Sequence, residues 1–177
     1  MKQSIIAGAV LILLPLILLS GSVSASGLFN QDPDWVYQLS TNSPCNLISA
    51  TLNGDSLPDI ILSDSYSECI QTFTGNGDGS FELYQTIFLT HAKWLETSDV
   101  DQDGDLDMLA ICAYDDSIFV MLNDGFGNLS TPIKSNFHDD AYGDNFVTAL
   151  FDSDTFPDII KGSGTVWYSH GNGDGTF

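Results

Sequence analysis

Residues 99–107 read Asp-Val-Asp-Gln-Asp-Gly-Asp-Leu-Asp, with acidic side chains at alternate positions and a glycine at the sixth. Two unit charges about 5 Å apart repel each other by roughly 3 kcal/mol at an effective dielectric constant of about 20. A loop that gathers several carboxylates is therefore stabilised by a cation. A ligand set of oxygen atoms, without His or Cys, suits Ca²⁺ better than zinc or copper. The alternative is a solvated acidic turn with no bound ion.

The residues that follow this loop favour a strand. An EF-hand loop has a bidentate Glu at its twelfth position and a helix on each side. Counting from Asp99, that position holds Ala110, and residues 108–113 form a short apolar run of strand length. We therefore expect the loop to join two strands, with Asp107 closing the site from the start of the second.

The acidic loop recurs in altered form about fifty residues away on each side, a period typical of propellers, solenoids and arrays. Residues 51–59 have Thr51 and Ser56 in place of the first acid and the glycine. Residues 150–158 have Leu150 and Thr155 at the same positions. A glycine turn follows each loop, and the three turns occupy residues 75–81, 123–129 and 171–177. The last residues of these turns are expected to pack between neighbouring repeats: Phe81, Leu129 and Phe177.

This combination of loop and turn resembles the FG-GAP/VCBS repeat family, which includes the repeats of the α-integrin head. The resemblance covers roughly residues 46–177 and implies a β-propeller whose calcium loops connect the first two strands of each blade. By position, it implies side-chain ligands at Asp99, Asp101, Asp103 and Asp107, with the carbonyl of Asp105 as a backbone ligand. The other loops depart from this pattern, and because affinity follows the number of charged ligands we expect weaker sites on the residues that they retain. These are Asn53, Asp55 and Asp59 in the first loop, and Asp152, Asp154 and Asp158 in the third, where the alternative is a structural relic that binds no ion.

We predict an all-β fold, a partial β-propeller of about three four-stranded blades built from repeats of ~50 residues. The expected divisions are a signal peptide at 1–25, an N-terminal segment with a possible closing strand at 26–45, and repeats at 46–95, 96–144 and 145–177, the last incomplete. Known propellers close with at least four blades. We therefore expect the chain to be a fragment of a longer repeat protein or to self-associate.

The composition indicates a secreted, acidic protein. Lys2, an apolar stretch at 5–19 and a small-residue site at 23–25 are typical of a cleaved secretory signal, which leaves no membrane span in the mature chain. The formal net charge of −20 argues against nucleic acid and anionic membrane surfaces as partners. The three cysteines leave one over in any pairing, so both a Cys45–Cys69 bridge and reduced thiols stay open, with Cys112 expected as a buried thiol.

The sequence contains no recognisable catalytic set. Its three histidines are far apart and none stands in a metal-binding spacing, so we treat them as isolated and the chain as no enzyme. The favoured interpretation is a secreted or cell-surface calcium-binding module for a protein or polysaccharide partner, with cell adhesion as one role. The alternatives are the N-terminal propeller part of a larger polysaccharide-degrading enzyme and a purely structural surface array.

Overall fold

Every strand that the structure describes belongs to one of three antiparallel sheets. The computed structural model of the chain describes residues 44–112, 117–136, 145–162 and 165–177, which form strands and turns and contain no helix. All of them lie within one structural unit, residues 37–177. Within these ranges, no helix has the length and hydropathy needed to cross a membrane. The all-β part of the predicted fold is confirmed, and the arrangement of the sheets as propeller blades stays a prediction.

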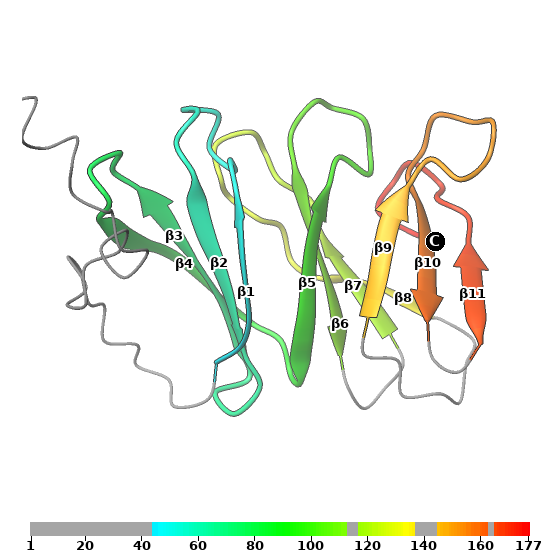
Figure 1. The fold of residues 1–177 in the computed structure, drawn as a ribbon, viewed down its shortest axis with the longest axis horizontal. Helices are drawn as coiled ribbons and strands as arrows, with labels where there is room; N and C mark the ends of the chain where they lie inside the picture. Colours follow the sequence, from blue (N-terminus) through cyan, green and yellow to red (C-terminus); the bar gives the residue numbers. More distant parts are fainter. Residues whose placement is uncertain (1–43, 113–116, 137–144, 163–164) are drawn as a thin grey trace, which may run out of the picture. The chain divides into compact units, whose positions relative to one another are not determined.

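Strands that follow one another in sequence are neighbours in each sheet, as Figure 1 shows. The first sheet contains β1 (Pro44–Ala50), β2 (Asp59–Asp64), β3 (Cys69–Gly75) and β4 (Phe81–Phe88). The second contains β5 (Ala92–Ser98), β6 (Asp107–Cys112), β7 (Ser117–Met121) and β8 (Ile133–Asn136). The third contains β9 (Asn145–Ala149), β10 (Asp158–Gly162) and β11 (Val166–Ser169).

The three sheets share one register at the acidic loops. In each sheet the closing aspartate is the first residue of the second strand and pairs with the last residue of the first strand. These pairs are Asp59 with Ala50, Asp107 with Ser98, and Asp158 with Ala149. Each acidic loop therefore connects the first two strands of its sheet, as predicted for the second loop from the apolar run that follows it.

Two hydrophobic clusters hold the sheets together, and β6 contributes to both. Successive side chains of a strand point to opposite faces of its sheet. Met108 and Ala110 accordingly lie in a cluster with Ile61 and Ile70 of the first sheet. Leu109 and Ile111 lie in a second cluster, which also contains Phe146 and Ile159 of the third sheet. Every residue of β6 is buried, which explains why residues 108–112 are apolar without polar alternation.

Two of the three residues that end the glycine turns pack between sheets. Leu129 is a member of the cluster shared by the first and second sheets. Phe177 packs against the cluster shared by the second and third sheets, and its N–H donates to Ser135 Oγ at 3.0 Å. Phe81 begins β4 and belongs to neither cluster of the described residues, so its packing between repeats stays a prediction.

The three cysteines form no disulfide. Cys45 is exposed and its thiol donates to Ser65 Oγ at 2.9 Å, whereas Cys69 and Cys112 are buried. Burial raises the pKa of the Cys69 thiol, and the charge of Asp64 acts in the same direction. The buried thiol predicted at Cys112 is confirmed, and the Cys45–Cys69 bridge left open by the sequence is absent. The signal peptide at 1–25, the closing strand expected before residue 44 and His138 lie outside the described residues.

Candidate metal centre

The second acidic loop brings three carboxylates together. Oxygen atoms of Asp99, Asp101 and Asp107 all lie within 4.8 Å of one another. Asp99 follows the end of β5, Asp101 lies in the loop, and Asp107 begins β6, where its side chain is fully buried. The donors come from both strands and from the loop between them, so an ion held by them would connect the two strands.

Hydrogen bonds within the loop fix the direction of its carboxylates. Asp99 Oδ2 accepts from the Gly104 N–H at 3.1 Å, and Asp101 Oδ1 accepts from the Asp103 N–H at 3.3 Å. Asp103 Oδ1 accepts from the Asp105 N–H at 2.9 Å. Gly104 has a φ of 97°, in the left-handed region that favours glycine, which explains the glycine at the sixth position.

A buried oxygen in this loop has no protein partner. Asp99 Oδ1 is buried and accepts no hydrogen bond, although its companion Oδ2 is paired with Gly104. A buried, unpaired carboxylate oxygen costs free energy unless a proton donor or a metal satisfies it. The donor set is entirely oxygen, which is the chemistry that Ca²⁺ requires. The residues of the second loop therefore fit a calcium ion.

Two predicted ligands lie outside this group of three. Asp103 is not among the converging donors, although its charge is close enough to raise the pKa of Asp101 and Asp107. Asp105 directs its carboxylate towards the glycine turn, because a Cβ placed on Gly125 would collide with Asp105 Oδ2. That orientation leaves the backbone carbonyl as the group that Asp105 has to offer to the loop.

Asp107 also joins the acidic loop to the glycine turn, a role that the sequence analysis missed. Its Oδ2 accepts from the Val100 N–H at 2.9 Å, and its Oδ1 accepts from the Asn123 N–H at 2.8 Å. Burial raises the pKa of Asp107 to about 6, and the charges of Asp101 and Asp103 act in the same direction, against the two backbone hydrogen bonds. Burial is also the main cause of the raised pKa of Asp101.

The closing aspartates of the other sheets make the same pair of bonds. Asp59 accepts from the N–H groups of Leu52 at 2.8 Å and Gly75 at 3.0 Å. Asp158 accepts from those of Phe151 and Gly171, both at 3.0 Å. Retention of this residue in all three repeats is therefore explained by structure alone, whether or not a loop binds metal.

The first loop has a poorer donor set. Asn53 directs its amide nitrogen to Asp55 Oδ2 at 2.9 Å, and Asp55 Oδ1 accepts from the Leu57 N–H at 2.8 Å. Ser56 has a φ of 67° where the second loop has Gly104, so the turn is kept at some cost in backbone strain. These features agree with the weaker site predicted at Asn53, Asp55 and Asp59.

A histidine lies against the carboxylates of the third loop, so the prediction that His170 is isolated was wrong. His170 Nδ1 lies 3.0 Å from Asp152 Oδ2 and 3.4 Å from Asp158 Oδ1, while Nε2 lies 3.4 Å from Asp154 Oδ2. His170 directly precedes the glycine turn, at the position of Thr74 and Leu122 in the other repeats. Alignment of the three repeats on their turns is the signal that would have pointed to it.

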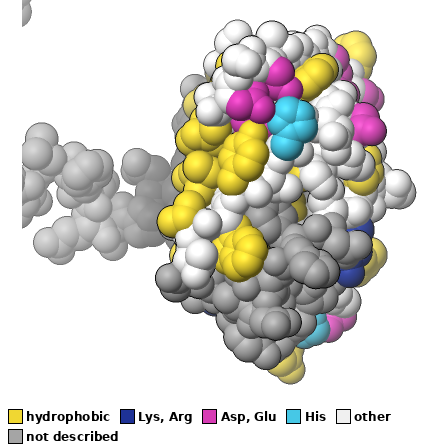
Figure 2. All heavy atoms as spheres, turned by 90° about the vertical axis from the view of Figure 1, so that its right-hand side faces the viewer, with side chains coloured by type: hydrophobic (Ala, Val, Ile, Leu, Met, Phe, Trp, Pro, Cys, Tyr) yellow, Lys and Arg dark blue, Asp and Glu magenta, His cyan; other side chains and the backbone are white. Residues whose placement is uncertain are grey.

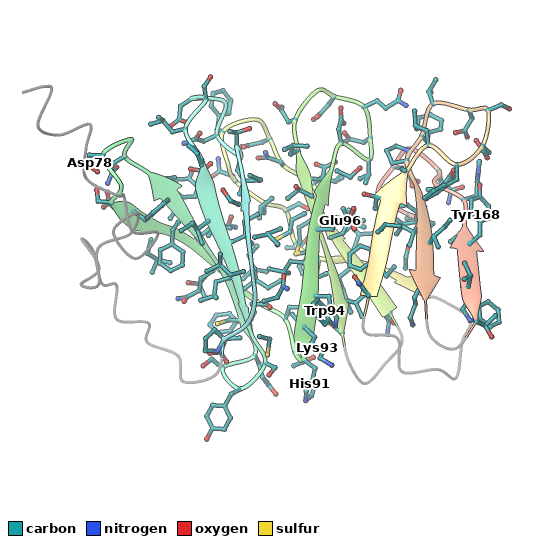
Figure 3. All side chains as sticks on the ribbon, viewed as in Figure 1. Asp78, His91, Lys93, Trp94, Glu96 and Tyr168 are labelled. Carbon is teal, nitrogen blue, oxygen red and sulfur yellow. The ribbon has the colours of Figure 1, made fainter. Side chains whose placement is uncertain are left out.

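Tyr168 completes the surroundings of Asp152. Tyr168 lies on β11, where Figure 3 labels it. Its hydroxyl donates to Asp152 Oδ2 at 3.1 Å. Burial and this bond to Asp152 raise the pKa of Tyr168 to about 12, so the phenol stays protonated. The N–H of Asp154 lowers the pKa of Asp152, so that carboxylate stays ionised.

Neighbouring loops touch one another. Asn123 Nδ2 donates to Leu52 O at 2.7 Å and to Leu106 O at 3.1 Å, which joins the first and second acidic loops. Gln102 Nε2 donates to Thr155 O, which joins the second and third. The three acidic loops therefore lie at the same end of the three sheets, at the top of Figure 1.

Comparison with known proteins supports the interpretation of the repeats. Residues 52–110 match a family described as the FG-GAP-like repeat, a span that includes the first two acidic loops and β2 to β5. No curated protein and no solved structure matches the chain significantly. Residues 52–110 are therefore similar to an FG-GAP-like repeat, which is consistent with the FG-GAP/VCBS type of repeat protein.

Proposed function

We propose that this chain is a secreted, calcium-binding repeat protein that acts as a non-catalytic binding or adhesion module for a protein or polysaccharide outside the cell. In this proposal the three sheets are blades of a partial β-propeller. The FG-GAP-like repeat at residues 52–110 supports a binding module, since domains of this type are generally non-catalytic. Two of the sheets have four antiparallel strands, the number found in a propeller blade, and the third has three within the described residues.

One observation carries the calcium part of the proposal. Asp99 Oδ1 is buried without a partner in a loop where oxygen atoms of Asp99, Asp101 and Asp107 converge. Ca²⁺ bound there would satisfy that oxygen and offset the repulsion between the carboxylates. It would also link the end of β5 to the start of β6. Asp103 and the carbonyl of Asp105 are the further ligands that we propose, and Asn53, Asp55 and Asp59 form a weaker site.

The exposed hydrophobic side chains of the third sheet support a binding role. Val166, Trp167 and Tyr168 are 72%, 36% and 49% exposed on β11, which pairs on one side only within the described residues. Figure 2 shows this side of the molecule, where hydrophobic and acidic side chains lie next to each other. Aromatic side chains of this kind are enriched at binding surfaces and stack on sugar rings or pack against protein partners.

Calcium titration tests the metal site. We expect isothermal titration of the tag-free protein to give one event that is tighter than any other. Asp99→Asn should remove that event, while Asp55→Asn, the matched change in the first loop, should leave it in place. Equal titration curves for Asp99→Asn and the parent would contradict the site.

Partner binding needs its own measurement. We expect calcium-loaded protein to bind members of a glycan or extracellular-protein array, and the Trp167→Ala variant to lose that signal. Binding of nucleic acid alone, or turnover of an arrayed polysaccharide, would contradict the proposed class of function.

A further inference from the structure

We propose that the third acidic loop, together with His170, forms a site for a transition cation of the zinc class and not for Ca²⁺. The proposed ligands are His170 Nδ1, Asp152 and Asp158. This site is separate from the calcium site proposed in the second loop, and neither depends on the other.

Both carboxylates lie at the spacing of a shared coordination shell from His170 Nδ1, and all three donor atoms lie within 4.8 Å of one another. His170 Nδ1 lies 3.0 Å from Asp152 Oδ2 and 3.4 Å from Asp158 Oδ1. Zinc bonds to His nitrogen and carboxylate oxygen of about 2.0–2.2 Å place neighbouring donors roughly 3.0–3.5 Å apart in octahedral or tetrahedral geometry. The measured separations fall in that range, so a small cation fits between the three groups.

The surroundings of these ligands are those of a metal site. A histidine that binds a metal through one ring nitrogen commonly donates its other N–H to a carboxylate, which fixes the ring. His170 Nε2 lies 3.4 Å from Asp154 Oδ2, in position for that contact. Tyr168 holds Asp152 by donating to its Oδ2 at 3.1 Å. Asp154 and Tyr168 are thus positioning residues for the two more exposed ligands.

Calcium suits this loop poorly. Ca²⁺ takes six to eight oxygen ligands, whereas Leu150 replaces the first acid here and His170 supplies a nitrogen donor. Thr155 stands at the glycine position without the positive φ that Ser56 and Gly104 adopt in the other loops. The mixed nitrogen and oxygen donor set favours zinc, cobalt, nickel or manganese over calcium.

The site is open to solvent on one side. Asp158 is fully buried, while the side chains of His170 and Asp152 are 51% and 38% exposed. Figure 2 shows a histidine against acidic side chains at the surface of this face. A cation can therefore enter from solvent and keep water in its remaining coordination positions.

Zinc titration of the tag-free protein in saturating Ca²⁺ tests the site, because the calcium fills the second loop first. We expect one zinc to bind, and His170→Thr to weaken it by more than about tenfold. This change installs the residue found at the same position of the first repeat, Thr74. His91→Asn, which changes a histidine outside the cluster, should leave zinc binding unchanged. Ring ¹⁵N shifts of His170 on zinc addition should identify Nδ1 as the ligand.

Three results would overturn the inference. Equal zinc affinity in His170→Thr and the parent would exclude His170 as a ligand. Displacement of the zinc by millimolar calcium would mean that the third loop is a calcium site without preference for zinc. The absence of zinc binding, with His170 shifts that respond only to pH, would mean that the ring serves as an internal counter-ion to the carboxylates. The Asp99→Asn calcium titration is read separately, so failure of one site is distinguishable from failure of the other.

Discussion

Gln85 and Leu129 are joined by two reciprocal hydrogen bonds. Gln85 Nε2 donates to Leu129 O at 3.0 Å, and the Leu129 N–H donates to Gln85 Oε1 at 3.0 Å. Gln85 lies on β4 of the first sheet, while Leu129 ends the glycine turn after β7 of the second. One primary amide thus pairs with both backbone polar groups of one residue across the junction between two sheets.

Replacing Gln85 should weaken that junction. We expect Gln85→Ala to lower the free energy of unfolding by about 1–3 kcal/mol, because it leaves the partly buried N–H and C=O of Leu129 unpaired. Urea unfolding followed by tryptophan fluorescence measures the change. Thr86→Ala, at the exposed neighbouring position on β4, is the control and should change stability by less than about 0.5 kcal/mol. Equal effects of the two substitutions would mean that the paired amide contributes nothing particular.

Calcium should stabilise the fold through the second loop. Ligand at about a hundred times its dissociation constant adds roughly 2.7 kcal/mol to the folded state. Chelator should therefore lower the melting temperature by several degrees, and magnesium should restore little of it, because Mg²⁺ needs a smaller octahedral shell. Differential scanning calorimetry gives the measurement.

The matched variants for this experiment are Asp103→Ala and Asp154→Ala. Asp103→Ala should abolish the effect of calcium on melting, whereas Asp154→Ala in the third loop should preserve it. A melting temperature that does not respond to chelator would mean that residues 99–107 are a solvated acidic turn.

Calcium affinity should fall in acid. The metal-free Asp107 has a pKa of about 6, raised by burial, so below that pH calcium must displace a proton from the carboxyl. The pKa of Asp101 is also raised, in the same direction. One displaced proton weakens binding by about tenfold per pH unit below about 6 and leaves it unchanged above. Titrations in two buffers of different ionisation enthalpy would count the protons released, and pH-independent affinity would contradict the assignment of Asp107 as a ligand.

Three glycines should respond differently to alanine. A Cβ at Gly75 would collide with the backbone carbonyl of Pro58, which cannot move away as a side chain can. We expect Gly75→Ala to cost about 1–3 kcal/mol or more. Gly104 meets no atom within 4 Å but has a φ of 97°, so Gly104→Ala should cost about 1–2 kcal/mol of backbone strain. Gly162 has neither constraint, and Gly162→Ala should be neutral or slightly stabilising. Denaturant midpoints that do not follow this order would contradict the explanation.

The sequence-based predictions that were confirmed rested on patterns of residues that lie close together in the chain. The acidic loop at residues 99–107 and the apolar run after it predicted a strand–loop–strand unit, and β5, β6 and the loop between them have that form. Both signals lie within a few residues of one another, at the range where side-chain alternation and turn chemistry act. The repeat of these signals predicted three similar units, and three sheets with one shared loop register were found.

Contacts between distant residues were not predictable in the same way. His170 is separated from Asp152 by two strands, and only an alignment of the three repeats on their glycine turns indicates that His170 lies near the third acidic loop. Asn123, in the glycine turn of the second sheet, donates to Leu52 in the acidic loop of the first, a contact that depends on how the two sheets pack. The second role of Asp107, as an acceptor for the Asn123 N–H, depends on the return of the chain through β6 and β7. These features follow from the packing of the sheets, which depends on many side chains at once and cannot be predicted from a short stretch of sequence.

Because β6 is buried on both faces, the second sheet contributes side chains to both hydrophobic clusters of residues 37–177. Its odd and even side chains serve different clusters, so any fluctuation that opens β6 disrupts both. We therefore expect the three repeats to unfold together in one cooperative transition and not one at a time. Amide hydrogens of residues 108–111 should exchange with solvent only through global unfolding, while those of β11, an edge strand in the described structure, should exchange through small local openings. Removing the middle repeat would therefore leave the first and third sheets each without half of the hydrophobic cluster that it packs in.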